Sequence, residues 1–494
     1  MNKQRILLNL LFSLLYVVDG LDKGTFPQSK KFSFGCATSA YQYEGATRRS
    51  GKSKSIWDKF VHLKPSLIYG NATGDKADQF YDRYSTDLKL FRRAIGIKYF
   101  SLSFSWARIL PDPRSGSKVD DAGIQHYKKL LKLVRSENLT AICTLYHWDL
   151  PEKLQDDYQG WISRRIVDDF RYYAQVVFTH IGSLCPMYVT LNEPHTVCTT
   201  GYGPNPSFAP YDKGSISAVY KCGHYSILSH LAAVEEYRKT KLNGKIGLKV
   251  DGNAMIPLDP NSKADQQAAF RGMVWGFGWF ANPLYKGNYP ASMLDDLDST
   301  ILPRFTLSEM KRLRQNKPDF LGYDGYTTGW ARPTKNCKRN ESNTWPICVD
   351  GIETLPNGTS IGPPTNSPWN FDYPQTLRIG LKHLYSTYGA YPLYIAENGM
   401  AVVNESQLSR SNALNDYARI NWYKGYLKVL KEVIEQDHIP VDGFIAWACL
   451  DNFEWIYGYN TRFGLIYVDY ETEQRYVKQS ARYLKGVFKQ GKPI

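Results

Sequence analysis

The sequence predicts an α/β fold, a single (β/α)8 or TIM barrel with long loops over the C-terminal face. Short apolar runs typical of buried parallel strands alternate with amphipathic helical patterns, and eight such repeats make up a barrel of this kind. Polar and aromatic residues cluster directly after the runs, where such barrels build their active sites. The 494 residues would suit about three average domains. Because α/β barrels often reach this length as one unit, we expect one domain.

The expected strands are short runs rich in β-branched and aromatic residues. They cover residues 32–40, 99–104, 140–146, 188–191, 245–250, 320–322, 393–396 and 444–448. Periodic apolar positions between them predict helices over residues 81–94, 124–136, 166–181, 218–239, 377–388 and 415–435. The segment 328–373 is rich in Pro, Asn and Gly and is long for a connection. We therefore expect it to cover the site.

Residues 1–20 have the pattern of a secretory signal peptide. Basic Lys3 and Arg5 precede an apolar stretch over residues 6–18, and Asp19 and Gly20 follow. The stretch is short for a membrane span, and no other segment resembles one. The chain ends in Lys-Pro-Ile rather than a retention signal of the KDEL type. These features predict a mature domain over residues 21–494 that is secreted or delivered to another compartment of the secretory pathway.

The composition is that of a soluble protein with a large core, with 43% hydrophobic and 22% charged residues. The net charge is +14, but no basic cluster with interleaved aromatics and no nucleic-acid-binding motif accompanies it. We therefore expect no nucleic-acid partner. The basic surface either keeps the protein soluble or holds it near acidic polysaccharide. The sequence leaves the oligomeric state open.

The cysteines and the glycosylation sequons bear on the same compartment. Cys337 and Cys348 flank a polar loop and are the best candidates for a disulfide, with Cys198 and Cys222 as a second pair. The other four lie in apolar runs and are expected to be buried thiols: Cys36, Cys143, Cys185 and Cys449. The candidate N-glycosylation sites are Asn71, Asn138, Asn340, Asn357 and Asn404.

Two glutamates stand at the ends of predicted strands. Glu193 lies in Thr-Leu-Asn-Glu-Pro and Glu397 in Tyr-Ile-Ala-Glu-Asn-Gly-Met. Pro194 is expected to hold Glu193 in an extended conformation. Either glutamate alone would be read as a surface or ion-paired residue. Together they predict the pair of carboxyl groups that hydrolyses a glycosidic bond, brought together by a large closed fold.

With these motifs, the chain resembles glycoside hydrolase family 1, the retaining β-glucosidases, and in particular its eukaryotic secreted branch. The resemblance covers residues 32 to 485. It implies that Glu193 is the general acid/base and Glu397 the nucleophile, with their carboxyl groups about 5–5.5 Å apart. It also implies that Arg108, in Phe-Ser-Trp-Ala-Arg-Ile-Leu-Pro, is held against the nucleophile, and that the hydroxyl of Tyr326 touches it.

The resemblance further implies a sugar-binding site and a cis peptide bond between Trp447 and Ala448. Polar side chains would bind the sugar hydroxyls, and aromatic rings would pack on the apolar faces of the sugar. Trp369 matches the platform for the leaving group. The residues that match the site for the non-reducing sugar are Gln42, His147, Trp148, Asn192, Trp447, Glu454, Trp455 and Phe463.

The chain departs from the family pattern most clearly at Asp324 and Gly325, where the family usually has Asn-Tyr. Because Tyr326 must reach Glu397, we expect Asp324 within about 6 Å of the catalytic pair, where a third carboxyl raises a neighbour's pKa. The alternative is that Asp324 turns away and accepts backbone hydrogen bonds.

The resulting hypothesis is a retaining β-glycosidase that needs no metal or organic cofactor and acts on a small-molecule or oligosaccharide β-glycoside. Glu454 suits free hydroxyls and would repel a 6-phosphate. Glucose, fucose, galactose and mannose glycosides stay open. The alternatives are a transglycosidase on the same site and, from another class, an inactive carbohydrate-binding or receptor protein. A thioglucosidase of this family would lack the acid that Glu193 supplies.

Overall fold

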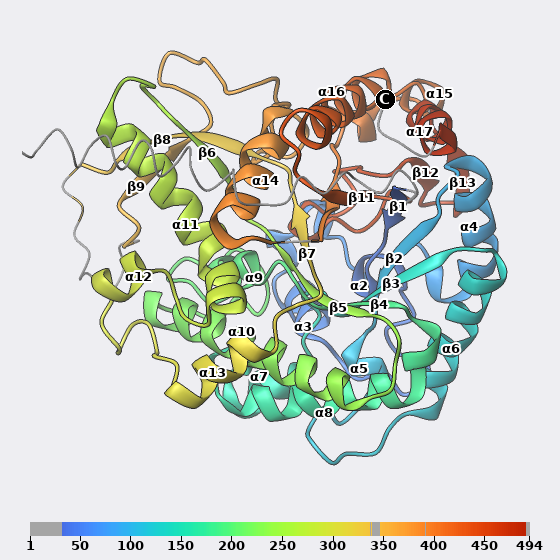
Figure 1. The fold of residues 1–494 in the computed structure, drawn as a ribbon. Helices are drawn as coiled ribbons and strands as arrows, with labels where there is room; N and C mark the ends of the chain where they lie inside the picture. The colour runs from blue at the N-terminus through green and yellow to red at the C-terminus, as the bar shows by residue number, and fades with distance from the viewer. Residues whose placement is uncertain (1–31, 336, 338–345, 391, 491–494) are drawn as a thin grey trace, which may run out of the picture. The chain divides into compact units, whose positions relative to one another are not determined.

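Eight parallel strands close into a barrel, which confirms the predicted fold class (Figure 1). The structure is a computed structural model and describes residues 32–335, 337, 346–390 and 392–490. Each barrel strand pairs with the next along the chain, and the last pairs with the first. The barrel strands are β1 (Ser33–Ala37), β2 (Tyr99–Ser103), β3 (Thr140–Tyr146), β4 (Met187–Asn192), β5 (Lys245–Val250), β7 (Phe320–Asp324), β10 (Leu393–Asn398) and β11 (Val441–Ala446). All eight predicted strands are present, with ends shifted by a few residues.

Long helices lie around the barrel strands, as Figure 1 shows. The six predicted helices are α4 (Phe80–Ala94), α6 (Asp121–Ser136), α8 (Arg165–Ile181), α10 (Ile216–Lys239), α14 (Gln375–Tyr388) and α16 (Tyr417–Glu435). Each turns an apolar stripe towards the strands, as at Ile124, Tyr127 and Leu131 of α6. Sequence reasoning missed α11 (Lys263–Lys286), α13 (Leu307–Gln315) and α17 (Gln479–Gln490). α11 is apolar on most sides and contains Pro283, so its periodicity is weak.

Shorter elements complete the connections. The short α-helices are α2 (Ala40–Tyr43), α3 (Ile56–Leu63), α5 (Trp106–Ile109), α7 (Glu152–Tyr158), α9 (Pro194–Gly201), α12 (Ala291–Asp296) and α15 (Arg410–Ala413). β6 (Ala254–Pro257), β8 (Thr328–Pro333) and β9 (Val349–Ile352) form a three-stranded sheet, and β12 (Ile466–Asp469) pairs with β13 (Gln474–Val477). The segment 328–373 therefore contains two strands rather than an irregular loop alone. No helix in the described part of the chain is long and apolar enough to cross a membrane.

All eight cysteines form disulfides, which corrects part of the sequence prediction. Cys337–Cys348 and Cys198–Cys222 pair as proposed. The four expected thiols instead form Cys36–Cys449, with the Cα atoms 5.2 Å apart, and Cys143–Cys185, at 6.4 Å. Closure of the barrel places β1 beside β11 and so brings Cys36 close to Cys449. The parallel pairing of β3 with β4 likewise brings Cys143 close to Cys185. Four disulfides fit an oxidising compartment.

Four of the five glycosylation sequons are accessible. Asn71, Asn138, Asn357 and Asn404 are exposed, as a glycan requires. Asn340 and the predicted signal peptide over residues 1–20 lie outside the described residues.

Candidate active site

Three carboxyl groups meet at the C-terminal ends of three barrel strands. Glu193 follows β4, Asp324 ends β7 and Glu397 lies near the end of β10. One carboxyl oxygen from each lies within 4.8 Å of an oxygen of the other two. This close approach of Glu193 and Glu397 fits the spacing of retaining glycosidases, since inverting enzymes leave about 6.5–9.5 Å between their carboxyl groups.

The backbone of Glu193 differs from the sequence prediction. Its φ and ψ are 45° and 59°, so the residue is left-handed rather than extended. Pro194 disfavours the right-handed helical conformation for the residue before it, and the left-handed conformation of Glu193 avoids that region. Non-glycine residues rarely occupy this region, and those that do often lie at functional sites.

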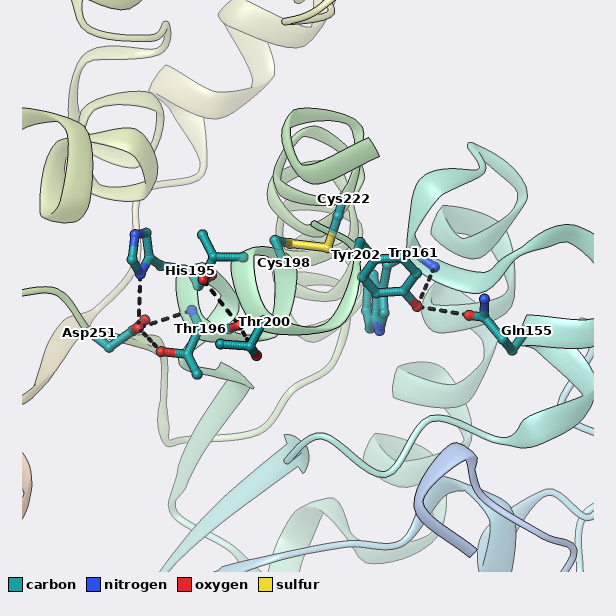
Figure 2. The surroundings of a disulfide bond; sticks show 10 residues. Gln155, Trp161, His195, Thr196, Cys198, Thr200, Tyr202, Cys222 and Asp251 are labelled. Carbon is teal, nitrogen blue, oxygen red and sulfur yellow. Dashed lines mark hydrogen bonds and ion pairs between the residues drawn. A yellow bond between two sulfur atoms is a disulfide. The ribbon is translucent and has the colours of Figure 1, made fainter. Parts of the chain in front are cut away.

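The helix that follows Glu193 is fixed at several points, as Figure 2 shows. Asp251 Oδ2 accepts hydrogen bonds from the backbone nitrogen of Thr196 (3.0 Å) and from its Oγ1 (2.5 Å), and pairs with His195 Nδ1 (3.3 Å). The disulfide Cys198–Cys222 joins α9 to α10. These contacts hold the N-terminus of α9, and therefore Glu193, in one position.

Glu397 is buried and bonded on both carboxyl oxygens. Lys249 Nζ on β5 donates to Oε1 at 2.7 Å, and the hydroxyl of Tyr326 donates to Oε2 at 3.3 Å. The Tyr326 contact confirms the sequence prediction, whereas the sequence analysis missed Lys249. Gly322 on β7 leaves room for this lysine, because a Cβ at that position would lie 3.0 Å from Lys249 Cγ.

Arg108 does not contact Glu397, which corrects the prediction. Its guanidinium pairs with Glu44, with Nε at 3.1 Å and Nη2 at 3.0 Å from Oε2, and Glu44 Oε1 accepts from the hydroxyl of Tyr127. It also donates to backbone carbonyls of residues 45, 46 and 49. Arg108 therefore holds the loop after α2, and Lys249 supplies the cation at Glu397.

Glu193 and Glu397 lie in different electrostatic surroundings. Burial raises the pKa of Glu193, and the carboxylates of Asp251, Asp324 and Glu397 raise it further. Burial alone would lower the pKa of Lys249, but Glu397 and Asp324 outweigh burial and raise it. A protonated Glu193 beside a charged Lys249–Glu397 pair is the arrangement of an acid facing a nucleophile.

Asp324 lies inside this cluster, as expected. Its side chain is 2% exposed, and neither carboxyl oxygen accepts a hydrogen bond from a donor in the described part of the chain. The alternative, in which Asp324 turns away to accept backbone hydrogen bonds, is therefore wrong. Burial raises its pKa, and so does the charge of Glu397.

The predicted sugar-binding residues converge on the same end of the barrel. Gln42 Nε2 donates to Asn452 Oδ1 at 2.9 Å and to Glu454 Oε2 at 3.4 Å. Asn192 Nδ2 lies 3.4 Å from His147 Nε2, and its Oδ1 has no partner among the described residues. Burial lowers the pKa of His147 and raises that of Glu454 to about 8. The site thus combines a neutral imidazole with amide and carboxyl groups suited to hydroxyls.

Aromatic rings line this polar group. His147 stacks on Trp447 with ring centroids 5.8 Å apart, and Trp148 stacks on Trp455 at 4.7 Å. The Trp447–Ala448 peptide bond is cis, as predicted. Trp369 is 38% exposed and stacks on Phe463 with ring centroids 6.4 Å apart, so part of its ring is accessible to a bound group.

The carboxyl cluster also bears on metal binding. Oxygen ligands at this spacing suit a hard divalent cation. Here, however, the Lys249 ammonium already bonds Glu397 and acts on Asp324. We therefore interpret the cluster as a site for proton transfer rather than a metal centre.

Known proteins of similar sequence have the activity that this geometry indicates. Residues 22–493 match the sequence profile of Glycosyl hydrolase family 1. The chain belongs to glycosyl hydrolase family 1. It is 37% identical over 488 residues to Beta-glucosidase 6 of Oryza sativa subsp. japonica, covering 95% of this chain and 92% of the relative.

Solved structures of β-glucosidases superpose on most of this chain. Beta-glucosidase 2 from the fungus Trichoderma reesei, in complex with Tris, superposes with a TM-score of 0.87 at 36% identity, over 93% of this chain and 98% of that one. A rice β-glucosidase in a covalent complex with Glc gives 0.88 at 36% identity, over 94% and 99%. This family 1 protein is accordingly an O-glycosyl hydrolase of the retaining β-glucosidase type.

Proposed function

We propose that this protein hydrolyses terminal non-reducing β-D-glycosyl residues with Glu397 as nucleophile and Glu193 as general acid/base. The observation that carries the assignment is the close approach of two unequal carboxyl groups. One is bonded to Lys249 at 2.7 Å, and the other lies among carboxylates that favour its protonated form. Retaining glycosidases require such a pair.

The reaction would proceed by double displacement. Glu397 attacks the anomeric carbon while Glu193 transfers its proton to the glycosidic oxygen, so the leaving group departs as an alcohol. Glu193 then removes a proton from water, whose oxygen attacks the anomeric carbon and releases Glu397. Lys249 pairs with the Glu397 carboxylate before the attack, and Tyr326 and Asn192 orient the reacting groups.

The surrounding residues support a neutral sugar as substrate. Gln42, His147 and Glu454 offer hydrogen bonds to hydroxyl groups, and Trp447 offers an apolar surface for the ring. Glucose is the first candidate, because the relatives named above are β-glucosidases. The exposed ring of Trp369 supports an aromatic or sugar leaving group. We further propose that the predicted signal peptide directs the protein into the secretory pathway, where the oxidising compartment allows the disulfides to form.

The Glu397→Ala variant tests the assignment. We expect hydrolysis of an aryl β-glucoside to fall by on the order of 10⁴-fold or more. Added azide should restore turnover and give the α-glycosyl azide, since the anion enters the space left by the carboxylate. Turnover that azide leaves unchanged would show that Glu397 is not the nucleophile.

Two alternative functions give different results in the same assay. A transglycosidase would transfer the sugar to an added alcohol in preference to water. An inactive carbohydrate-binding protein would bind glucosides without releasing the phenol. The ionised pair Lys249–Glu397 beside Glu193 favours hydrolysis over simple binding, because a binding site gains nothing from opposed protonation states.

A further inference from the structure

Asp324 is a buried acid for which the double displacement has no role. It ends β7, and its Cα is the register partner of Glu397 on β10. A carboxyl oxygen of Asp324 lies within 4.8 Å of one of Glu193, and neither oxygen of Asp324 has a hydrogen-bond partner in the described part of the chain. Two ionised carboxylates offer only acceptors, so a hydrogen bond between them requires a proton on one of the two.

The other charged groups of the cluster already have their own partners. Lys249 Nζ bonds Glu397 Oε1 at 2.7 Å. Asp251, although close enough to raise the pKa of Glu193, receives two hydrogen bonds from Thr196. This leaves Glu193 and Asp324 facing each other without a cation of their own in the described part of the chain.

We propose that Asp324 and Glu193 share one proton, so that the acid protonating the leaving group is a carboxyl pair rather than Glu193 alone. The inference rests on the proposed function and adds a residue to it. Asp324 would be a positioning residue that keeps the proton on the pair and directed at the site.

The pair balances charge through the cycle. In the free enzyme Glu397 is ionised and the pair carries one proton, so the three carboxyl groups hold two negative charges. Glu397 becomes a neutral ester as the pair gives its proton to the glycosidic oxygen, and two charges remain, now on the pair. Water then returns a proton to the pair as its oxygen displaces the ester, and Glu397 is ionised again.

The pair also sets a pH dependence. Removing the proton leaves two adjacent like charges, so the second ionisation of the pair moves to higher pH. Activity towards poor leaving groups should be lost only as the pH rises through that value. The titratable groups that face the pair from the surrounding elements are His147, His195, Lys249, Asp251, Tyr326, Glu397 and Glu454.

The test is kcat/KM against pH for the wild type and for Asp324→Asn, with aryl β-glucosides of poor and good leaving groups. With the poor leaving group, we expect the alkaline limb of the variant to move to lower pH by about one unit or more. The good leaving group needs little protonation and should show a much smaller shift. Asp324→Ser, which removes the carboxyl differently, should behave like Asp324→Asn.

Two further variants separate proton sharing from other effects. Asp251 acts on Glu193 through charge more strongly than Asp324 does, so Asp251→Asn should shift the limb more if charge alone matters. Proton sharing predicts the larger shift for Asp324→Asn. Asp78 is equally buried and unpartnered on both oxygens but lies among Asp87, Glu473 and Arg475, so Asp78→Asn should leave the limb in place.

Three outcomes would overturn the inference: superimposable limbs in wild type and both Asp324 variants, a larger shift in Asp251→Asn, or an equal shift in Asp78→Asn. A wild type that releases no phenol at any pH would instead contradict the proposed function.

Discussion

Two buried clusters of charged residues differ in the balance between cations and carboxyl groups. The first cluster has three of each: Arg419, Arg462 and Lys478 with Glu405, Asp416 and Asp451. Within it, Asp451 accepts hydrogen bonds from both Arg462 and Lys478, each at 2.7 Å. Burial would raise the pKa of Asp451, but these two cations outweigh burial and lower it. The second cluster gathers Glu193, Asp324 and Glu397 around Lys249.

This difference suits the first cluster to stabilising the fold and the second to proton transfer. A buried carboxylate with cations on each oxygen stays ionised and holds its neighbours in place. Carboxyl groups that outnumber their cation cannot all ionise, so a proton stays within the cluster and is available for transfer. The first cluster is expected to respond to substitution in unfolding measurements and the second in pH-dependent kinetics.

After the loss expected for Glu397→Ala, the largest expected effect is at Glu193. The Glu193→Ala variant should lose about 10²–10⁴-fold in kcat/KM on substrates with poor leaving groups, because general acid catalysis contributes on that order. Substrates with good leaving groups should lose far less in the glycosylation step. A series of aryl β-glucosides of graded leaving-group pKa measures this, and an equal loss across the series would remove the acid role.

Lys249 comes next. Lys249→Met should lower kcat/KM by on the order of 10²-fold, as for removal of one charged donor from a buried site. In a profile of kcat/KM against pH, the acid limb should move to higher pH, because the variant lacks the cation that pairs with Glu397. Lys478→Met, which removes the matching lysine of the first cluster, should lower the unfolding temperature and leave the limbs in place. Identical profile changes in both variants would erase the distinction between the clusters.

Arg108 tests the same distinction within the active-site loops. Arg108→Met leaves Glu44 buried and without its guanidinium, which should cost about 3–5 kcal/mol of unfolding free energy. Below the unfolding temperature, the acid limb should stay where it is in the wild type. Chemical denaturation and a pH profile measure the two effects, and a shifted limb would mean that Arg108 acts on Glu397 after all.

The smallest expected effect is a gain in stability. Because the folded-state pKa of Asp324 is raised, Asp324 opposes folding increasingly as the pH rises above about 4, where the unfolded residue ionises. Asp324→Asn should therefore raise the free energy of unfolding by about 1 kcal/mol at pH 7, and by less at pH 4. Denaturation at the two pH values measures this, and a stability difference that does not change with pH would contradict it.

The sequence was sufficient where the signal is local. Eight apolar runs predicted the barrel, and the motifs around Glu193 and Glu397 predicted two carboxyl groups that the structure brings together, because each strand end carries its own pattern. Asp324 was found because it departs from the family pattern at a strand end. These features need no knowledge of which strands become neighbours.

The remaining features depend on closure of the barrel. Cys36 and Cys449 lie 413 positions apart, and only pairing of the first and last strands brings them together. A lysine in a strand is normally exposed, so the sequence did not indicate that Lys249 is buried. Its burial depends on Gly322 of β7, which leaves room for the lysine side chain. The resemblance predicted that Arg108 is the cation beside Glu397. In the structure, the guanidinium of Arg108 instead pairs with Glu44. A charged residue inside a strand buried on both faces is the signal that would have identified Lys249.

The proposed double displacement requires a covalent bond between Glu397 and the sugar. A 2-deoxy-2-fluoro β-glucoside with a good leaving group slows release of the sugar, so that the glycosyl-enzyme accumulates. Mass spectrometry of the digested protein should then find one added 2-deoxy-2-fluoroglucosyl group, on the peptide that contains Glu397, and reactivation in buffer should remove it. A label on Glu193 or Asp324, or hydrolysis without any labelled peptide, would show that Glu397 is not the nucleophile.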